Sequence, residues 1–92
     1  MTLHMEDDDK LQVLRPRYME RLRERIVLLE KLSDGPWDEI HRLAHSMASS
    51  AQMYGHPELA RAARKLEASC EKGEQDQTAL AGLIEAARRV AR

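Results

Sequence analysis

His45 is the residue of this chain best placed to do chemistry. Imidazole is the side chain that most readily gains and loses a proton near neutral pH, and its free nitrogen can act as a nucleophile. Several of the residues that follow it are small, in the segment His45-Ser46-Met47-Ala48-Ser49-Ser50-Ala51-Gln52-Met53-Tyr54-Gly55. A bulky partner can therefore reach the imidazole and exchange a phosphoryl group with it.

The spacing of apolar residues predicts where this imidazole lies. Ile40, Ala44, Met47 and Ala51 recur at intervals of three and four, so they form the buried seam of a helix. At about 100° per residue, His45 falls roughly 120° from that seam, at the border of the solvent-exposed face. His41 is expected between His45 and the seam. Ala48, Ser49 and Gln52 are expected to surround the imidazole on the next turn, as a binding surface.

Glu67 is the candidate partner of His45. It belongs to the next predicted helix, on a flank shared with Ala60 and Ala63, whose small side chains let two helices approach closely. A carboxylate that accepts a hydrogen bond from Nδ1–H fixes the tautomer, leaves the Nε2 lone pair exposed and stabilises positive charge on the ring. The sequence therefore predicts a nucleophile, His45, oriented by Glu67.

Four amphipathic helices are expected to position these residues. The first begins at about Pro16, with a stripe from Tyr18 to Leu32, and the second spans about 36–54 and ends at Gly55. The third begins at Pro57 and ends at Gly73, and a fourth follows Asp76 as its cap. Short connections make successive helices antiparallel, which predicts an all-α, up-down-up-down four-helix bundle.

The domain organisation follows from the same pattern. Residues 16–92 are expected to form one bundle, and the apolar seams of its helices can bury one another within a monomer. Residues 1–15 include Glu6-Asp7-Asp8-Asp9-Lys10 and lack apolar periodicity, so they are expected to be a disordered or tag-like segment.

Composition excludes several classes of function. The formal net charge is −1, which gives no general attraction to nucleic acid or to an anionic membrane. The longest apolar run, Ile26 to Leu29, is far shorter than the roughly 20 residues of a spanning helix. We therefore expect a cytoplasmic protein that binds neither nucleic acid nor membrane. The single cysteine, Cys70, is expected to pack in a helix interface.

The segment from His45 to Gly55 resembles the pattern of the histidine phosphotransfer (HPt) family, His-x-Leu-Lys-Gly-Ser-x-x-x-x-Gly. Met47 stands at its apolar position, Ser50 at its serine and Gly55 at its glycine. Lys65-Leu66-Glu67 resembles the family's next helix, and Glu67 matches the glutamate that supports the histidine in chemotaxis-type kinases. Two positions depart from the pattern, since Ala48 replaces the lysine and Ser49 replaces the glycine.

The resemblance implies a role in a two-component phosphorelay. It makes His45 the phosphoacceptor in a domain without kinase activity of its own and without a cofactor. Its partners would be a response-regulator receiver domain, a sensor histidine kinase, or both. The missing lysine at position 48 removes a cation near the phosphoryl group, which would affect the transfer rate and the choice of partner.

Two other functions are compatible with the sequence. A helical module that docks a receiver domain or a kinase without being phosphorylated is the first, and Ala48 is the residue that favours it. Zinc binding by His41 and His45 is the second, because the two stand four residues apart on a helix. Arg42 follows His41 where a zinc-protease helix has glutamate, and no third ligand is evident, so the sequence predicts no metal site.

Overall fold

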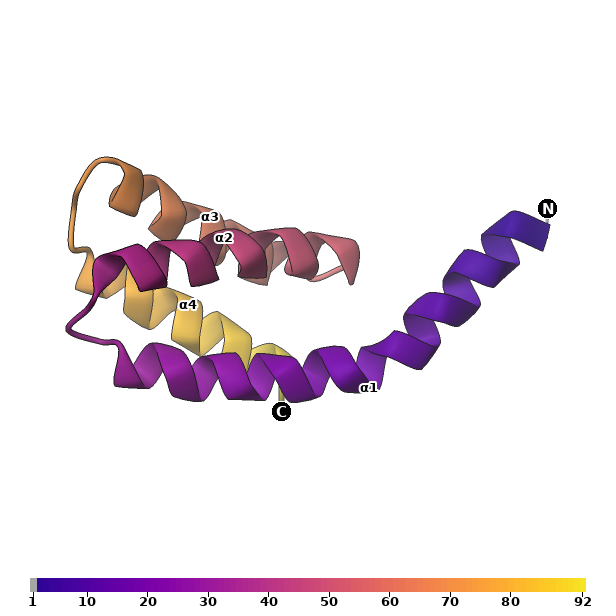
Figure 1. Ribbon diagram of the computed structural model, residues 1–92. Helices are drawn as coiled ribbons and strands as arrows, with labels where there is room; N and C mark the ends of the chain where they lie inside the picture. Colours follow the sequence, from indigo (N-terminus) through magenta and orange to yellow (C-terminus); the bar gives the residue numbers. More distant parts are fainter. Residues whose placement is uncertain (1) are drawn as a thin grey trace.

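Four α-helices make up the structure, a computed structural model that describes the backbone of residues 2–92 and the side chains of residues 14–92. They are α1 (Thr2–Lys31), α2 (Trp37–Met53), α3 (Pro57–Glu71) and α4 (Gln77–Val90). Successive helices run in opposite directions and pack side by side (Figure 1). The predicted all-α four-helix bundle is confirmed, and residues 2–92 contain no β-strand.

The helix ends lie close to where the sequence predicts them. Gly55 and Gly73 follow α2 and α3 with φ angles of 79° and 76°, in the left-handed region that glycine adopts without steric cost. Pro57 occupies the start of α3, where its missing N–H costs no helical hydrogen bond. The turn that contains Gly55 and Pro57 fixes the position at which α2 and α3 begin their antiparallel contact.

The core is built from the predicted seams. Ile40, Ala44, Met47 and Ala51 of α2 are almost completely buried, and they pack with apolar side chains of the other three helices. The remaining fully buried large side chains are Leu22, Leu29, Leu59, Leu66, Leu80 and Leu83. Because α2 is held along its whole seam, the residues on its opposite border have fixed directions. Cys70 is half-buried at the edge of this core, as predicted.

The first helix differs from the prediction at its beginning. The backbone is helical from Thr2 rather than from about Pro16, and its first turns project beyond the other three helices (Figure 1). Residues 2–15 contain neither glycine nor proline, so no residue there interrupts a helix. Pro16 lies within α1 and lacks the N–H that would continue the hydrogen-bond ladder. That residues 16–92 form the domain stays a prediction.

The helices differ in how closely they pack. Contact is most extensive between α2 and α3 and least extensive between α1 and α2. Stacked rings bridge part of the interface between α1 and α2. The centroids of Tyr18 and Tyr54 lie 4.3 Å apart, and the ring of His56 also stacks with that of Tyr18, at 5.8 Å. The rings connect α1 to the turn between α2 and α3.

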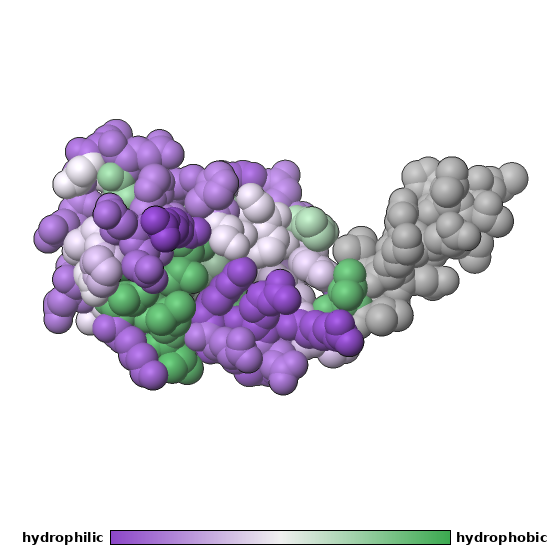
Figure 2. Space-filling view, viewed as in Figure 1, coloured by the Kyte–Doolittle hydropathy of each residue, from purple (hydrophilic) through white to green (hydrophobic). Residues whose placement is uncertain are grey.

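Most of the surface facing the viewer in Figure 2 is hydrophilic, and an apolar patch interrupts it at the end of α1. Val27 and Leu28, which are 51% and 39% exposed, belong to this part of α1. No helix within residues 2–92 combines the length and the apolar character that a membrane crossing requires.

Asp76 caps α4 and should make the stability of the bundle depend on pH. Its carboxylate accepts hydrogen bonds from the backbone N–H of Ala79 at 2.9 Å and from the Ser69 hydroxyl at 3.0 Å. These two hydrogen bonds hold the pKa of Asp76 below its ordinary value, and the bond from Ala79 has the larger effect. The capping contribution is therefore complete above the unfolded-state pKa of about 3.9 and is lost as the pH falls through the lower folded-state pKa.

We expect Asp76→Ala to lower the melting temperature at pH 7, because the substitution removes the cap. The difference from the parent should shrink as the pH falls below about 4, the unfolded-state pKa, and should be lost once the folded parent carboxylate is protonated at its lowered pKa. Thermal melts followed by circular dichroism at several pH values measure both effects. Asp34→Ala, at an exposed position of the α1–α2 turn, is the matched control. Equal melting temperatures of parent and Asp76→Ala at pH 7 would contradict this role.

Candidate functional site

His45 projects from the middle of α2 toward solvent. Its side chain is 70% exposed, whereas Ala44 and Met47, its neighbours on the seam, are buried. The helix is held rigidly on its seam, so the imidazole is accessible without being mobile on a loop. This agrees with the predicted position at the border of the exposed face.

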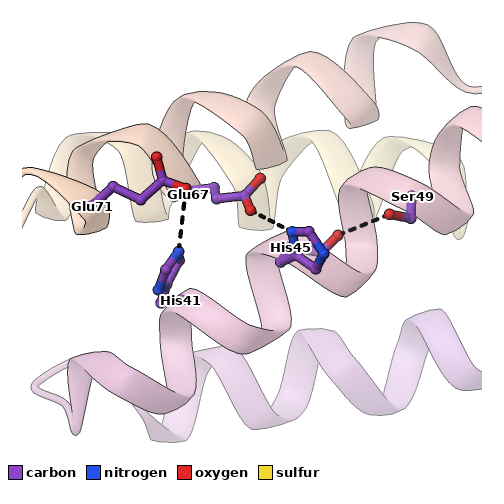
Figure 3. Close-up of polar contacts among 5 residues, drawn as sticks. All are labelled: His41, His45, Ser49, Glu67 and Glu71. Atoms are coloured by element: carbon purple, nitrogen blue, oxygen red, sulfur yellow. Dashed lines mark hydrogen bonds and ion pairs between the residues drawn. The ribbon is translucent and has the colours of Figure 1, made fainter.

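Glu67 of α3 lies directly against the imidazole. Its Oε2 atom is hydrogen-bonded to Nδ1 of His45 (Figure 3), and its side chain is only 18% exposed. An ionised carboxylate can only accept hydrogen bonds, so Nδ1 carries a hydrogen, and in the neutral imidazole Nε2 keeps its lone pair. The predicted contact between Glu67 and His45 is therefore present, and Nε2 is the ring nitrogen that takes no part in it.

A second histidine–glutamate contact lies one turn away. Nε2 of His41 is 3.7 Å from Oε1 of Glu71 (Figure 3). From the His45–Glu67 contact to the His41–Glu71 contact, the position moves four residues back on α2 and four residues forward on α3, as antiparallel helices require. Both histidines, both glutamates and Arg42 line one surface hollow of about 520 Å³.

The sequence did not identify Glu71, although the register could have done so. Once His45 is paired with Glu67, antiparallel packing places the residue four positions before His45 opposite the residue four positions after Glu67.

The other predicted binding residues have separate environments. Ser49 is exposed, and its hydroxyl donates a hydrogen bond to the carbonyl of His45 at 3.4 Å. Gln52 is exposed and accepts a hydrogen bond from Arg64 of α3. The Ser49 hydroxyl therefore contacts the backbone of His45.

The prediction that Ala48 contributes to the surface around His45 is wrong. Ala48 is only 4% exposed and belongs to the core. It lies about 60° from the seam direction, much closer than His45 does. Ala60 and Ala63 of α3 are buried as well. Because these side chains are small, α3 can pack closely against α2 and cover the methyl group of Ala48.

Arg25 of α1 also reaches the histidine helix, which the sequence did not reveal. Its guanidinium donates to the Ser46 hydroxyl at 3.0 Å and lies 3.5 Å from the Ser50 hydroxyl. Together with Arg17 and Arg21 it lines a groove of about 420 Å³ between α1 and α2, and Ser49 lines the same groove. A positively charged groove therefore begins at Ser49, one turn after His45 on α2.

His56 is the remaining histidine among residues 14–92, and its environment is unlike that of His45. It is half-buried beside Tyr18. Burial, with a contribution from the charge of Arg15, lowers the pKa of His56. His45 is the most exposed of the histidines in this part of the chain.

Comparison with known proteins gives one match. Residues 13–91 match the family described as the Hpt domain, which covers all four helices apart from the first turns of α1. Neither the curated proteins nor the solved structures contain a match to the chain. An exposed histidine on the second helix of a four-helix bundle agrees with this family. The chain therefore belongs to the Hpt domain family, the phosphotransfer domains of two-component signalling.

Proposed function

We propose that His45 accepts a phosphoryl group from the phosphorylated aspartate of a response-regulator receiver domain and can return it to such an aspartate. The observation that carries this proposal is the contact between Glu67 and Nδ1 of an otherwise exposed imidazole. In the neutral imidazole this contact keeps the hydrogen on Nδ1, and the Nε2 lone pair is then available for attack on phosphorus.

The chemical step follows from this geometry. The Nε2 lone pair attacks phosphorus, an N–P bond forms, and the bond between phosphorus and the aspartyl oxygen breaks, so that aspartate leaves as a carboxylate. The ring gains positive charge, and the Glu67 carboxylate stabilises that charge through Nδ1–H. The receiver domain would supply the metal ion and align the leaving oxygen. The domain itself needs no nucleotide and no cofactor for this role.

The surface beside His45 suits an acidic partner. Arg17, Arg21 and Arg25 line the groove between α1 and α2, and Ser49 links that groove to the His45 turn. A protein that presents a phosphorylated aspartate is anionic at its active site, so these cations would favour its approach. A receiver domain, alone or in relay with a sensor histidine kinase, is therefore the partner we propose for a monomeric, cytoplasmic bundle.

Transfer of label tests the proposal. The bundle is mixed with a receiver domain that carries radioactive phosphate on aspartate, and the bundle is then separated by electrophoresis. We expect label on the bundle that is stable in base and lost in acid, as a phosphorylated histidine is. Binding of the receiver domain without transfer of label would instead support the docking module that Ala48 favours.

Glu67→Ala should slow transfer without abolishing it. The substitution removes the group that fixes the tautomer and stabilises the charged ring, while the nucleophilic nitrogen remains. We expect the rate of transfer to fall by about 10- to 100-fold, measured with Mg²⁺ present for the receiver domain. His41→Gln is the control, because His41 contacts Glu71 and not His45, and it should leave the rate nearly unchanged. A Glu67→Ala variant as fast as the parent would show that the contact does not assist transfer.

A further inference from the structure

We propose that His41, Glu67 and Glu71 form a binding site for Zn²⁺. One ligand atom from each of these residues lies within 4.8 Å of the other two. The residues come from two helices, and the antiparallel contact of α2 with α3 holds them together. The sequence offered His41 and His45 as zinc ligands without a third, and the fold brings Glu67 and Glu71 to His41 as carboxylate ligands.

The donors suit zinc better than the other common divalent ions. Zn²⁺ accepts a mixture of imidazole nitrogen and carboxylate oxygen, and a site with three protein ligands keeps one position for water. Tetrahedral coordination places ligand atoms about 3.4 Å apart, so the present donors need to move only slightly inward. Glu71 can do so because its side chain is 61% exposed. Mg²⁺ prefers oxygen ligands in an octahedron and keeps most of its water.

The charges around the hollow also favour a cation. Glu67 and Glu71 bring two negative charges to the hollow, and Arg42 brings one positive charge. A neutral His41 adds a donor without adding charge. A divalent ion therefore meets a net negative site, and the exposed Arg42 side chain is free to turn toward solvent.

Glu67 connects this site to His45. One carboxylate oxygen accepts the hydrogen bond from His45, and the second can bind the ion at the same time. The ion would withdraw negative charge from the carboxylate, which would then stabilise a positively charged imidazole less well. Zn²⁺ is thus expected to slow phosphoryl transfer. This effect rests on the function proposed above, whereas the binding of Zn²⁺ is independent of that function.

Calorimetric titration with Zn²⁺ tests the site in the unphosphorylated full chain. We expect one ion per chain, with affinity reduced about tenfold or more in His41→Gln and in Glu71→Gln. Glu58→Gln, the same change at the other end of α3, should bind like the parent. Trp37 stands four residues before His41 on α2, so its fluorescence provides a second readout close to the site.

Two results would overturn the zinc site. One is the absence of saturable binding by the parent, and the other is unchanged binding by both His41→Gln and Glu71→Gln. His45→Gln separates this proposal from the phosphotransfer role, because it removes the proposed acceptor and keeps all three ligands. We expect this variant to bind Zn²⁺, and loss of its binding would contradict the assignment of the ligands.

Discussion

Replacing His45 by glutamine is expected to abolish phosphoryl acceptance while the bundle stays folded. Glutamine has no basic nitrogen with a free lone pair, so position 45 no longer supplies a nucleophile to attack phosphorus. The side chain is 70% exposed, and its loss creates no cavity in the core. Label on the variant should fall to background, and its melting temperature should stay within a few degrees of the parent's.

His41→Gln is the matched variant for this experiment. The same substitution one turn earlier on α2 changes the other histidine of the hollow and should preserve acceptance. The opposite result, with label on His45→Gln and none on His41→Gln, would show that His41 is the phosphoacceptor. Loss of label in both variants would show that the hollow as a whole, rather than one nitrogen, is required.

Ala44→Asp is expected to unfold the domain. Ala44 is completely buried in the seam of α2, where a carboxylate finds no polar partner and little space. An unpaired buried charge costs about 3–5 kcal/mol, and forcing a larger side chain into a filled core costs about 1–3 kcal/mol more. Together these costs are comparable to the roughly 5–10 kcal/mol that stabilises a domain of this size. We expect circular dichroism at 25 °C to show lost helicity and no cooperative thermal transition.

Ser49→Asp provides the control for the helix itself. It introduces the same side chain five residues later on α2, at an exposed position, where water solvates the charge. This variant should melt cooperatively near the parent. A stable Ala44→Asp variant would mean that the buried face of α2 has been assigned to the wrong residues.

The sequence was sufficient to predict the helices and the buried face of α2. Periodicity places Ile40 and Met47 on one side of a helix whatever that helix packs against, and Gly55 ends α2 through local backbone geometry alone. The contact of His45 with Glu67 was also predictable, because the resemblance to a known family supplied the pairing of the two helices.

Details that depend on the distance between helices were not predictable. A helical projection gives the direction of Ala48 but not how closely α3 approaches it, so its burial became evident only in the structure. The hydrogen bond from Arg25 to Ser46 depends on the axial offset of α1 against α2. A long flexible side chain such as arginine can also reach many partners, which makes its contacts difficult to infer from spacing.

The unequal packing of the helices has a consequence for motion. Because α1 has its least extensive contact with α2 and α2 its most extensive contact with α3, local unfolding should begin where α1 meets α2. The amides of α2 and α3 would then exchange with solvent more slowly than those at the α1–α2 edge. His45 and Glu67 lie on the two helices that separate last, so their hydrogen bond can persist through fluctuations that loosen the rest of the bundle.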